Sequence, residues 1–259
     1  MKESELRIGL LISGSGTTAE AVIKACQQGK IEKLKPAVVI SSCREAPGIQ
    51  KTKALGIPTF IVERKNFPTA NAFGEELLTV FKDFKVDLIS QNGWLPLTPP
   101  QVVEEYFGKI INQHPGPLDP GRVDFGGQGM YGARVTCARL AYIWMTGKDF
   151  WTESTIHHVT TEYDKGDLVS IMVMEIPPID YPKTTEQLQY SPQQLIEATK
   201  EVQTKLLPLE HHNVITTLKR FSNERELPGF KRPQPLILPE NKHLVDRAKN
   251  LAIKLFPGG

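Results

Sequence analysis

Two side chains near the middle of this sequence have the types and the spacing that acyl-transfer chemistry needs. Asn112 and His114 lie within the run Asn-Gln-His-Pro-Gly at 112–116. In an extended segment, positions 112 and 114 point to the same side, so a carboxamide lies beside an imidazole. The amide can donate to a developing oxyanion, and the imidazole can carry a proton near neutral pH. The pair therefore predicts an acyl-transfer site, with a purely structural histidine as the alternative.

An acidic turn follows at residues 162–166, with the sequence Glu-Tyr-Asp-Lys-Gly. We expect a carboxylate from this turn to approach His114 and hold the imidazole protonated, because a nearby negative charge favours the charged form of a base. The alternative is an ordinary polar turn that contains a glycine.

A glycine-rich segment, Gly-Ser-Gly-Thr-Thr-Ala at 14–19, connects a predicted strand to a predicted helix. Glycines let the backbone approach an anion closely, and a helix N-terminus presents free N–H groups. The segment predicts a phosphate site, with a tight strand-to-helix turn as the alternative. The residues expected to hold the phosphate are Gly14, Gly16, Thr17 and Thr18.

The same segment fits a dinucleotide-binding motif, but no acidic residue ends the second predicted strand, which disfavours NAD. Arg44 follows that strand instead. Arg44 would suit the 2′-phosphate of NADP, so an NADP-dependent oxidoreductase is a rival function, and a solvent-exposed arginine is the alternative. We expect no metal site, because no set of His, Cys and Asp residues has convincing zinc spacing.

Alternating strands and helices must position these residues. The fold class predicted is α/β, with a Rossmann-like open, mostly parallel twisted sheet and helices on both faces. Ligands bind at the carboxyl ends of such strands, where the glycine-rich segment and the Asn–His pair lie. The strands expected are 7–13, 37–42, 59–62, 87–90 and 109–112, and the helices are 17–28 (capped by Thr17 or Thr18), 46–55, 69–84 and 100–106.

The second half of the chain follows a different pattern. Residues 112–132 are rich in Gly and Pro and predict a long functional loop. A helix at 134–145, strands at 154–160 and 168–176, and a helix at 194–218 that Pro208 kinks or splits are expected next. A small helix is expected at 244–255. We expect residues 1–220 to form the main domain and residues 221–259 to form a C-terminal extension packed on it or trailing from it.

Composition narrows the function classes. The chain has 259 residues, with 31 basic and 29 acidic ones, which argues against a strongly basic nucleic-acid binder. Its three cysteines are far apart and predict no disulfide framework. No signal peptide is recognisable, and no apolar run approaches the ~20 residues that span a bilayer. We expect a cytoplasmic protein with no membrane or nucleic-acid partner.

Four segments together resemble a known family. They are LLISGSGTT (10–18), DLISQNGWLPLTP (87–99), KIINQHPGPL (109–118) and STIHHVTTEYDKGDLV (154–169). In this order they resemble the phosphoribosylglycinamide formyltransferases, which are folate-dependent enzymes of purine synthesis. The resemblance runs from about residue 7 to about residue 218.

The resemblance implies a function and roles. The formyl group of 10-formyltetrahydrofolate would pass to the amine of glycinamide ribonucleotide. Asn112 and protonated His114 would stabilise the oxyanion, Asp164 would hold His114, and His157 matches a histidine behind the catalytic group. Main-chain groups of residues 16–18 would cradle the ribose phosphate. The folate would contact Gly93, Trp94, Leu95, Pro96, Leu97 and Tyr163.

The sequence also departs from the family. Pro96 replaces an arginine and has no N–H to donate, so we expect the folate to use Leu95 and Leu97 instead. The family's glutamate for the acceptor ribose falls on Gln203 or on Glu210, depending on which neighbouring pair is matched.

Other functions stay open. A formyltransferase acting on another amine, such as an amino sugar, is one alternative. A non-catalytic binding protein is another. The short tail after residue 220 argues against a methionyl-tRNA formyltransferase, and the early first strand argues against a formyltetrahydrofolate hydrolase. The protein is expected to be a monomer or a homodimer.

Overall fold

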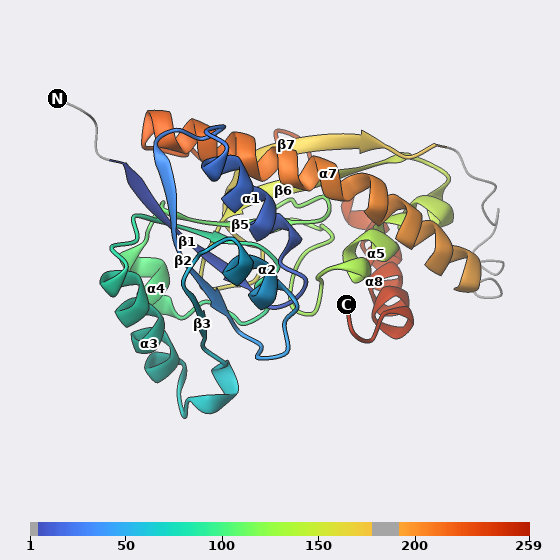
Figure 1. The fold of residues 1–259 in the computed structure, drawn as a ribbon. Coiled ribbons are helices and arrows are strands. Elements are labelled where there is room, and N and C mark those ends of the chain that lie inside the picture. The colour runs from blue at the N-terminus through green and yellow to red at the C-terminus, as the bar shows by residue number, and fades with distance from the viewer. Residues whose placement is uncertain (1–4, 178–191) are drawn as a thin grey trace.

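A seven-stranded sheet forms the centre of the fold in the computed structural model, which describes residues 5–177 and 192–259. The first five strands in chain order run parallel, and the last two pair antiparallel to their neighbours. Across the sheet, the order is β3 (Thr59–Ile61), β2 (Leu34–Ser41), β1 (Leu6–Ile12), β4 (Leu88–Gln91), β5 (Ile110–His114), β6 (Trp151–His158) and β7 (Leu168–Glu175) (Figure 1).

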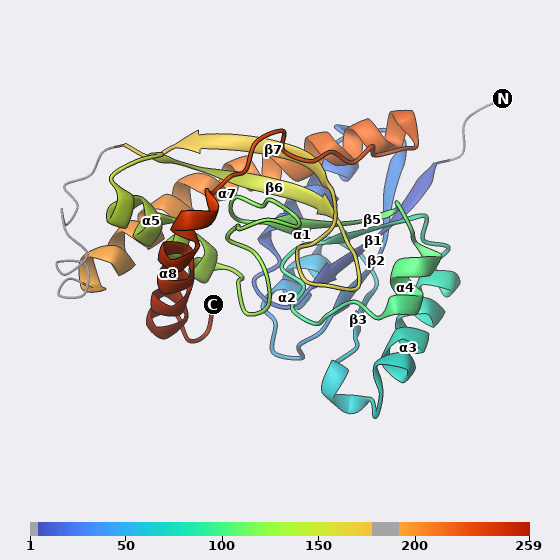
Figure 2. The ribbon, with the colours of Figure 1, turned by 180° about the vertical axis from the view of Figure 1, so that it is seen from behind.

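Helices cover both faces of this sheet, which confirms the predicted fold class. Alternate residues of β1 serve opposite faces: Ile8 and Leu10 join one core cluster and Leu11 joins the other. Both faces are buried, so the strand is a continuous apolar run. The first face carries α1 (Thr17–Gln27) and α7 (Pro192–Glu224), the second carries α3 (Ala70–Asp83) and α4 (Pro100–Glu105), and α2 (Gly48–Ala54) lies beside α1 (Figures 1 and 2).

Helix α1 begins differently from the sequence expectation. Gly16, with φ of 64°, is its N-cap, and no side chain caps it, so the predicted cap at Thr17 or Thr18 is wrong. A Cβ on Gly16 would lie 2.7 Å from the Cα of Gly48. The close approach of α2 and the left-handed backbone therefore both require glycine at this position.

Helix α7 continues through Pro208, so the predicted split is wrong. Proline removes one backbone hydrogen bond, at a typical cost of about 3 kcal/mol. Residues before it, such as Val202, pack in the cluster of α5 (Ala133–Thr146), and residues after it, such as Val214, pack against the sheet and α1. Burial on both sides of the proline stabilises a single helix.

The C-terminal residues pack at one end of the sheet. Helix α8 (Lys242–Leu255) lies beside α5, and Val245, Ala248 and Ala252 join the same apolar cluster (Figure 2). Helix α5 is buried over most of its length. Neither it nor any other helix in the described ranges is both long enough and apolar enough to cross a membrane.

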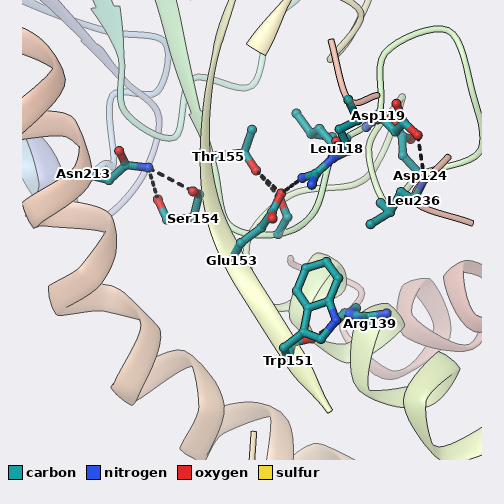
Figure 3. Close-up of polar contacts among 12 residues, drawn as sticks. Leu118, Asp119, Asp124, Arg139, Trp151, Glu153, Ser154, Thr155, Asn213 and Leu236 are labelled. Carbon is teal, nitrogen blue, oxygen red and sulfur yellow. Dashed lines mark hydrogen bonds and ion pairs between the residues drawn. The ribbon is translucent and has the colours of Figure 1, made fainter. Parts of the chain in front are cut away.

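Polar contacts tie the segment before α8 to the loop at 116–132. Arg232 donates to the carbonyl of Leu118 over 2.8 Å and pairs with Glu153 of β6, whose side chain is fully buried. The N–H of Leu236 donates to Asp119 Oδ2 over 2.8 Å. Figure 3 shows how Leu118, Asp119, Glu153 and Leu236 gather beside the sheet. These contacts hold the loop against the C-terminal segment.

Candidate active site

A cavity of about 850 Å³ lies at the carboxyl ends of β4 and β5. Its volume is within the range of about 300–1,000 Å³ that is typical of small-molecule sites. Its walls come from the ends of β4, β5 and β6, from the segments 93–98, 127–132 and 159–164, and from one face of α7. The structure thus brings together segments that are up to 195 residues apart, from Ser15 to Glu210.

His114 and Asp164 meet in this cavity. Nδ1 of His114 lies 3.6 Å from Oδ2 of Asp164, and both side chains are almost fully buried. A carboxylate oxygen only accepts, so we assign the proton of a neutral imidazole to Nδ1, the nitrogen that faces Asp164. Nε2 of His114 then has a lone pair, and among the described residues it has no hydrogen-bond partner. This nitrogen is buried at the cavity and keeps an unused hydrogen-bonding position.

The charge states of this pair differ from the sequence expectation. Burial lowers the pKa of His114 below its ordinary value and outweighs the attraction of Asp164. This direction favours the neutral imidazole at pH 7, against the expectation that Asp164 holds it protonated, and the charge state of His114 stays a prediction. Burial alone would raise the pKa of Asp164, but His114, His157 and the N–H of Gly127 together hold that pKa well below its usual range. Asp164 is thus the ionised member of the pair.

His157 lies between Asp164 and Asn112. Its Nδ1 lies 2.7 Å from the carbonyl oxygen of His158, which only accepts, so this nitrogen carries the proton. Its Nε2 then accepts from the Asn112 amide over 3.1 Å and lies 3.4 Å from Oδ1 of Asp164. A primary amide has two N–H bonds, so Asn112 keeps one donor for a ligand at the cavity wall.

The acidic turn is built to hold Asp164 in place. Asp164 has a left-handed backbone, with φ of 56°. A Cβ on Gly166 would lie 1.8 Å from the carbonyl oxygen of His158, so only glycine lets the turn lie against β6. The N–H of Gly127 donates to Oδ2 of Asp164 over 2.9 Å. Strained backbone of this kind is common where a side chain is held for function.

The residues expected to hold folate line one wall of the cavity: Gly93, Trp94, Leu95, Pro96, Leu97 and Tyr163. The Trp94 ring is buried and stacks on Phe73, so it packs the core behind this wall. The N–H of Leu95 already donates to Ser13 Oγ over 2.9 Å. This N–H is therefore already engaged, and the expected use of Leu95 and Leu97 by the folate stays a prediction. The exposed Leu95 and Leu97 side chains present apolar surface at the wall.

The glycine-rich segment reaches the cavity at two residues. Ser15 and Thr17 line its wall, whereas Gly14, Gly16 and Thr18 do not. Thr18 is buried, and the role of Gly16 is explained by its contact with α2. The free end of α1 still faces the cavity at Thr17, so a phosphate site at this position stays a prediction.

Helix α7 contributes both candidates for the acceptor contact. Gln203 and Glu210 are two turns apart on the same face of the helix and both line the cavity. Burial raises the pKa of Glu210 to about 7, and the neighbouring Gln113 side chain opposes that rise. The geometry places both residues at the cavity and leaves the choice between them a prediction.

Two further features bear on the sequence expectations. Arg44 is exposed and lies outside the cavity lining, so this cavity does not support an NADP site. The described residues include no cluster of three or more His, Cys, Asp or Glu side chains arranged to hold a metal ion.

The N–H of Gly127, a partner of Asp164, was not predicted from the sequence. The only signal for it was the composition of the surrounding loop, because a backbone donor has no side-chain signature.

Comparisons with known proteins show the family of this chain. The family model described as "Formyl transferase" matches residues 6–199. A phosphoribosylglycinamide formyltransferase from Haemophilus influenzae is 30% identical over 163 residues, which cover 63% of this chain and 70% of that protein. The corresponding Bacillus subtilis protein is 27% identical over a match that covers 70% of this chain and 85% of that protein. A chloroplastic relative from Arabidopsis thaliana is 26% identical over 68% of this chain, which spans only 58% of that protein.

Solved structures show the same similarity. The phosphoribosylglycinamide formyltransferase of Coxiella burnetii aligns with a TM-score of 0.66 at 27% identity, over 91% of this chain and 97% of the other. The protein of the same description from Anaplasma phagocytophilum aligns with a TM-score of 0.64 at 26% identity, over 85% and 89%.

Proposed function

The chain belongs to the formyl transferase family, and on that premise we propose that it moves the formyl group of 10-formyltetrahydrofolate to the primary amine of glycinamide ribonucleotide. The family generally uses a formyl-folate donor, and the relatives named above act on this acceptor according to their descriptions. The observation that carries the proposal is the joint placement of Asn112, His114 and Asp164 in one cavity.

The geometry supports separate roles for Asn112 and His114 in formyl transfer. When the acceptor amine attacks the formyl carbon, the carbonyl oxygen becomes an oxyanion. The unused N–H of Asn112 is a donor for that oxyanion. Nε2 of neutral His114 accepts the proton that the attacking amine loses. That proton then passes to the folate nitrogen as the carbon–nitrogen bond breaks, so the imidazole returns to its neutral form.

Asp164 supports the step in which His114 is charged. Its carboxylate is ionised and faces Nδ1, so it stabilises the transient imidazolium by attraction across a buried contact. Because the imidazole is neutral before the reaction, it is ready to act as a base at pH 7. His157 serves the same site by fixing the Asn112 amide.

The phosphate-bearing acceptor is supported by the end of helix α1. Thr17 opens that helix at the cavity wall, and a helix N-terminus favours an anion. A neutral amino sugar would make no use of this feature. The exposed leucines of the segment 93–98 suit the flat apolar ring system of a folate.

The test compares acceptors and donors directly. The loss of 10-formyltetrahydrofolate is followed by ultraviolet difference spectroscopy with glycinamide ribonucleotide, with glycinamide ribonucleoside, or with an amino sugar as acceptor. We expect turnover with the ribonucleotide and much less with the ribonucleoside. Faster turnover of the amino sugar would replace the proposed acceptor, and no formyl loss with any acceptor would contradict the proposed reaction. An NADPH absorbance assay under the same conditions is the control for the oxidoreductase alternative.

A further inference from the structure

One peptide unit in the loop at 116–132 is held at both of its ends by charged side chains. The ammonium of Lys249, on α8, donates to the carbonyl oxygen of Gly126 over 2.7 Å. The N–H of Gly127 donates to Oδ2 of Asp164 over 2.9 Å. This carbonyl and this N–H belong to the same planar peptide, in which they point in opposite directions. The cation and the carboxylate therefore fix one rigid group between them.

Both residues of this peptide have to be glycine. A Cβ on Gly126 would lie 2.5 Å from Leu118 Cδ2 and 2.8 Å from Asp164 Cβ. Gly127 has φ of 101°, which side chains rarely allow. Two consecutive glycines let the loop approach Asp164, but they also remove the steric barriers that keep a peptide plane from turning over. Hydrogen bonds have to hold this plane instead.

We propose that Lys249 is a positioning residue for the active site, which keeps the peptide between Gly126 and Gly127 oriented so that its N–H faces the carboxylate of Asp164. This inference rests on the proposed function, in which Asp164 supports His114. Lys249 lies outside residues 6–199, the part of the chain that the family model matches. The C-terminal helix thus contributes to a site that the matched segment builds.

The base of this arrangement is rigid. Arg134 of α5 donates to the carbonyl oxygens of Phe256 and Pro257, which follow α8, over 2.8 and 2.6 Å. The buried face of α8 packs in the apolar cluster of α5. Figures 1 and 2 show the two helices side by side from opposite directions. Lys249 therefore reaches the loop from a fixed position.

Loss of the Lys249 contact has a defined electrostatic consequence. The titratable groups around Asp164 come from several elements. His114 of β5 and His157 of β6 face its carboxylate, and Tyr163 is its neighbour in the turn. Lys249 approaches from α8 and is close enough to interact with the same carboxylate through its charge. If the peptide turns, its N–H leaves the carboxylate. A carboxylate that loses a donor is less stable in its ionised form, so its pKa rises. The more basic carboxylate favours the imidazolium of His114 more strongly, so the acid limb of the kcat–pH profile, which reports protonation of that base, moves to higher pH.

The first test needs no turnover. The sequence has two Gly-Gly pairs, at 126–127 and 258–259. In protein labelled with carbonyl-¹³C,¹⁵N-glycine, an HNCO spectrum therefore shows only the amides of Gly127 and Gly259. We expect Lys249→Met to shift the Gly127 amide proton upfield, as Asp164→Asn does. We expect Lys249→Arg, which keeps a cationic donor, to leave that proton near its wild-type position. The control is Lys242→Met, which removes an exposed pair with Asp246 on the same helix.

The second test measures catalysis. Loss of a hydrogen bond to a charged group predicts that Lys249→Met lowers kcat about 10- to 100-fold, with KM little changed. We expect the acid limb of the kcat–pH profile of Lys249→Met to lie at higher pH than that of the wild type. We expect Lys249→Arg to restore most of the rate. A Gly127 amide that stays in place in folded Lys249→Met would overturn the proposal, as would an unchanged kcat–pH profile. If Lys249→Met fails to fold, loss of the wild-type Gly127 shift in Lys249→Arg would also count against it. If wild-type protein transfers no formyl group while the Gly127 shifts behave as expected, the proposed function fails and the positioning contact stands.

Discussion

Asp164 lies between two histidines and accepts a hydrogen bond from a backbone N–H. This arrangement keeps a buried carboxylate ionised beside a neutral imidazole. In the proposed mechanism, a neutral His114 acts as a general base and not as the expected oxyanion donor. Burial removes water from the imidazole and lowers its pKa. No pattern of residues in the sequence shows that His114 is buried in this way.

At this scale we predict that Asp164→Asn lowers kcat about 10²- to 10⁴-fold, because the imidazolium loses its counter-charge. Asparagine tolerates a left-handed backbone, so the fold is expected to persist. Steady-state formyl transfer and thermal unfolding measure the two effects. Asp167→Asn is the control, because Asp167 is half-exposed and pairs only loosely with Lys231. A variant at Asp164 with a near wild-type rate and a normal Tm would remove the residue from the mechanism.

The contribution of Glu210 to stability is predicted to depend on pH. Its pKa of about 7, raised by burial, lies above the ordinary value of 4.5. The unfolded chain ionises first as pH rises, so the stability associated with the neutral carboxyl is present below the unfolded pKa and is lost as pH rises through the folded one. Glu210→Gln cannot ionise and escapes this loss.

We therefore expect Glu210→Gln to unfold like the wild type near about pH 4.5, and to gain up to about 3 kcal/mol over it by about pH 8.5. Urea unfolding at both pH values measures the gap. Glu201→Gln on the same helix is the control, since Glu201 is exposed beside Lys205 and should show no such gap. An equal difference at both pH values would show that ionisation of Glu210 does not matter.

At the scale of elements, helices α1 and α2 meet at two glycines. Gly16 combines a left-handed backbone with a Cβ position 2.7 Å from the Cα of Gly48. We predict that Gly16→Ala destabilises the fold by about 1–3 kcal/mol, because strain and overlap both oppose the methyl group. Chemical denaturation measures the loss. Gly14→Ala is the control for stability, since its Cβ would meet nothing within 4 Å. Equal stability of the two variants would contradict this account.

At the scale of the whole molecule, the pair between Arg232 and Glu153 joins the C-terminal segment to the sheet. Glu153 is fully buried, and burial raises its pKa while Arg232 opposes that rise. We predict that Arg232→Met costs about 3–5 kcal/mol, because a buried carboxylate is left without its counter-charge. Adding Glu153→Gln should recover part of the loss, and urea unfolding of the single and double variants measures it.

The neighbouring Lys231 supplies the matched control. It lies 3.9 Å from Asp167 in an exposed pair, and such pairs contribute little. Lys231→Met should therefore unfold like the wild type. A similarly small effect of Arg232→Met would mean that the pair with Glu153 is not needed to hold the C-terminal segment. The division of the chain at residue 220 stays a prediction.

The sequence by itself determined the elements and the composition of the site. Apolar runs such as β1 and the glycines after it predict strands and turns, because local periodicity and backbone freedom act over a few residues. The positions of Asn112 and His114 at a strand end followed from the same reasoning. Asp164 could be predicted as a site residue because the acidic turn at 162–166 is visible in the sequence and resembles a segment of a known family.

Only the tertiary structure decided which groups meet and in which charge state. The contact between Gly127 and Asp164 spans 37 residues, that of Arg232 with Glu153 spans 79, and that of Lys249 with Gly126 spans 123. Such pairs depend on how whole elements pack, and no local pattern encodes that packing. The lowered pKa of His114 and the continuity of α7 through Pro208 likewise follow from burial, because removal of water and apolar packing outweigh the intrinsic preferences of single residues.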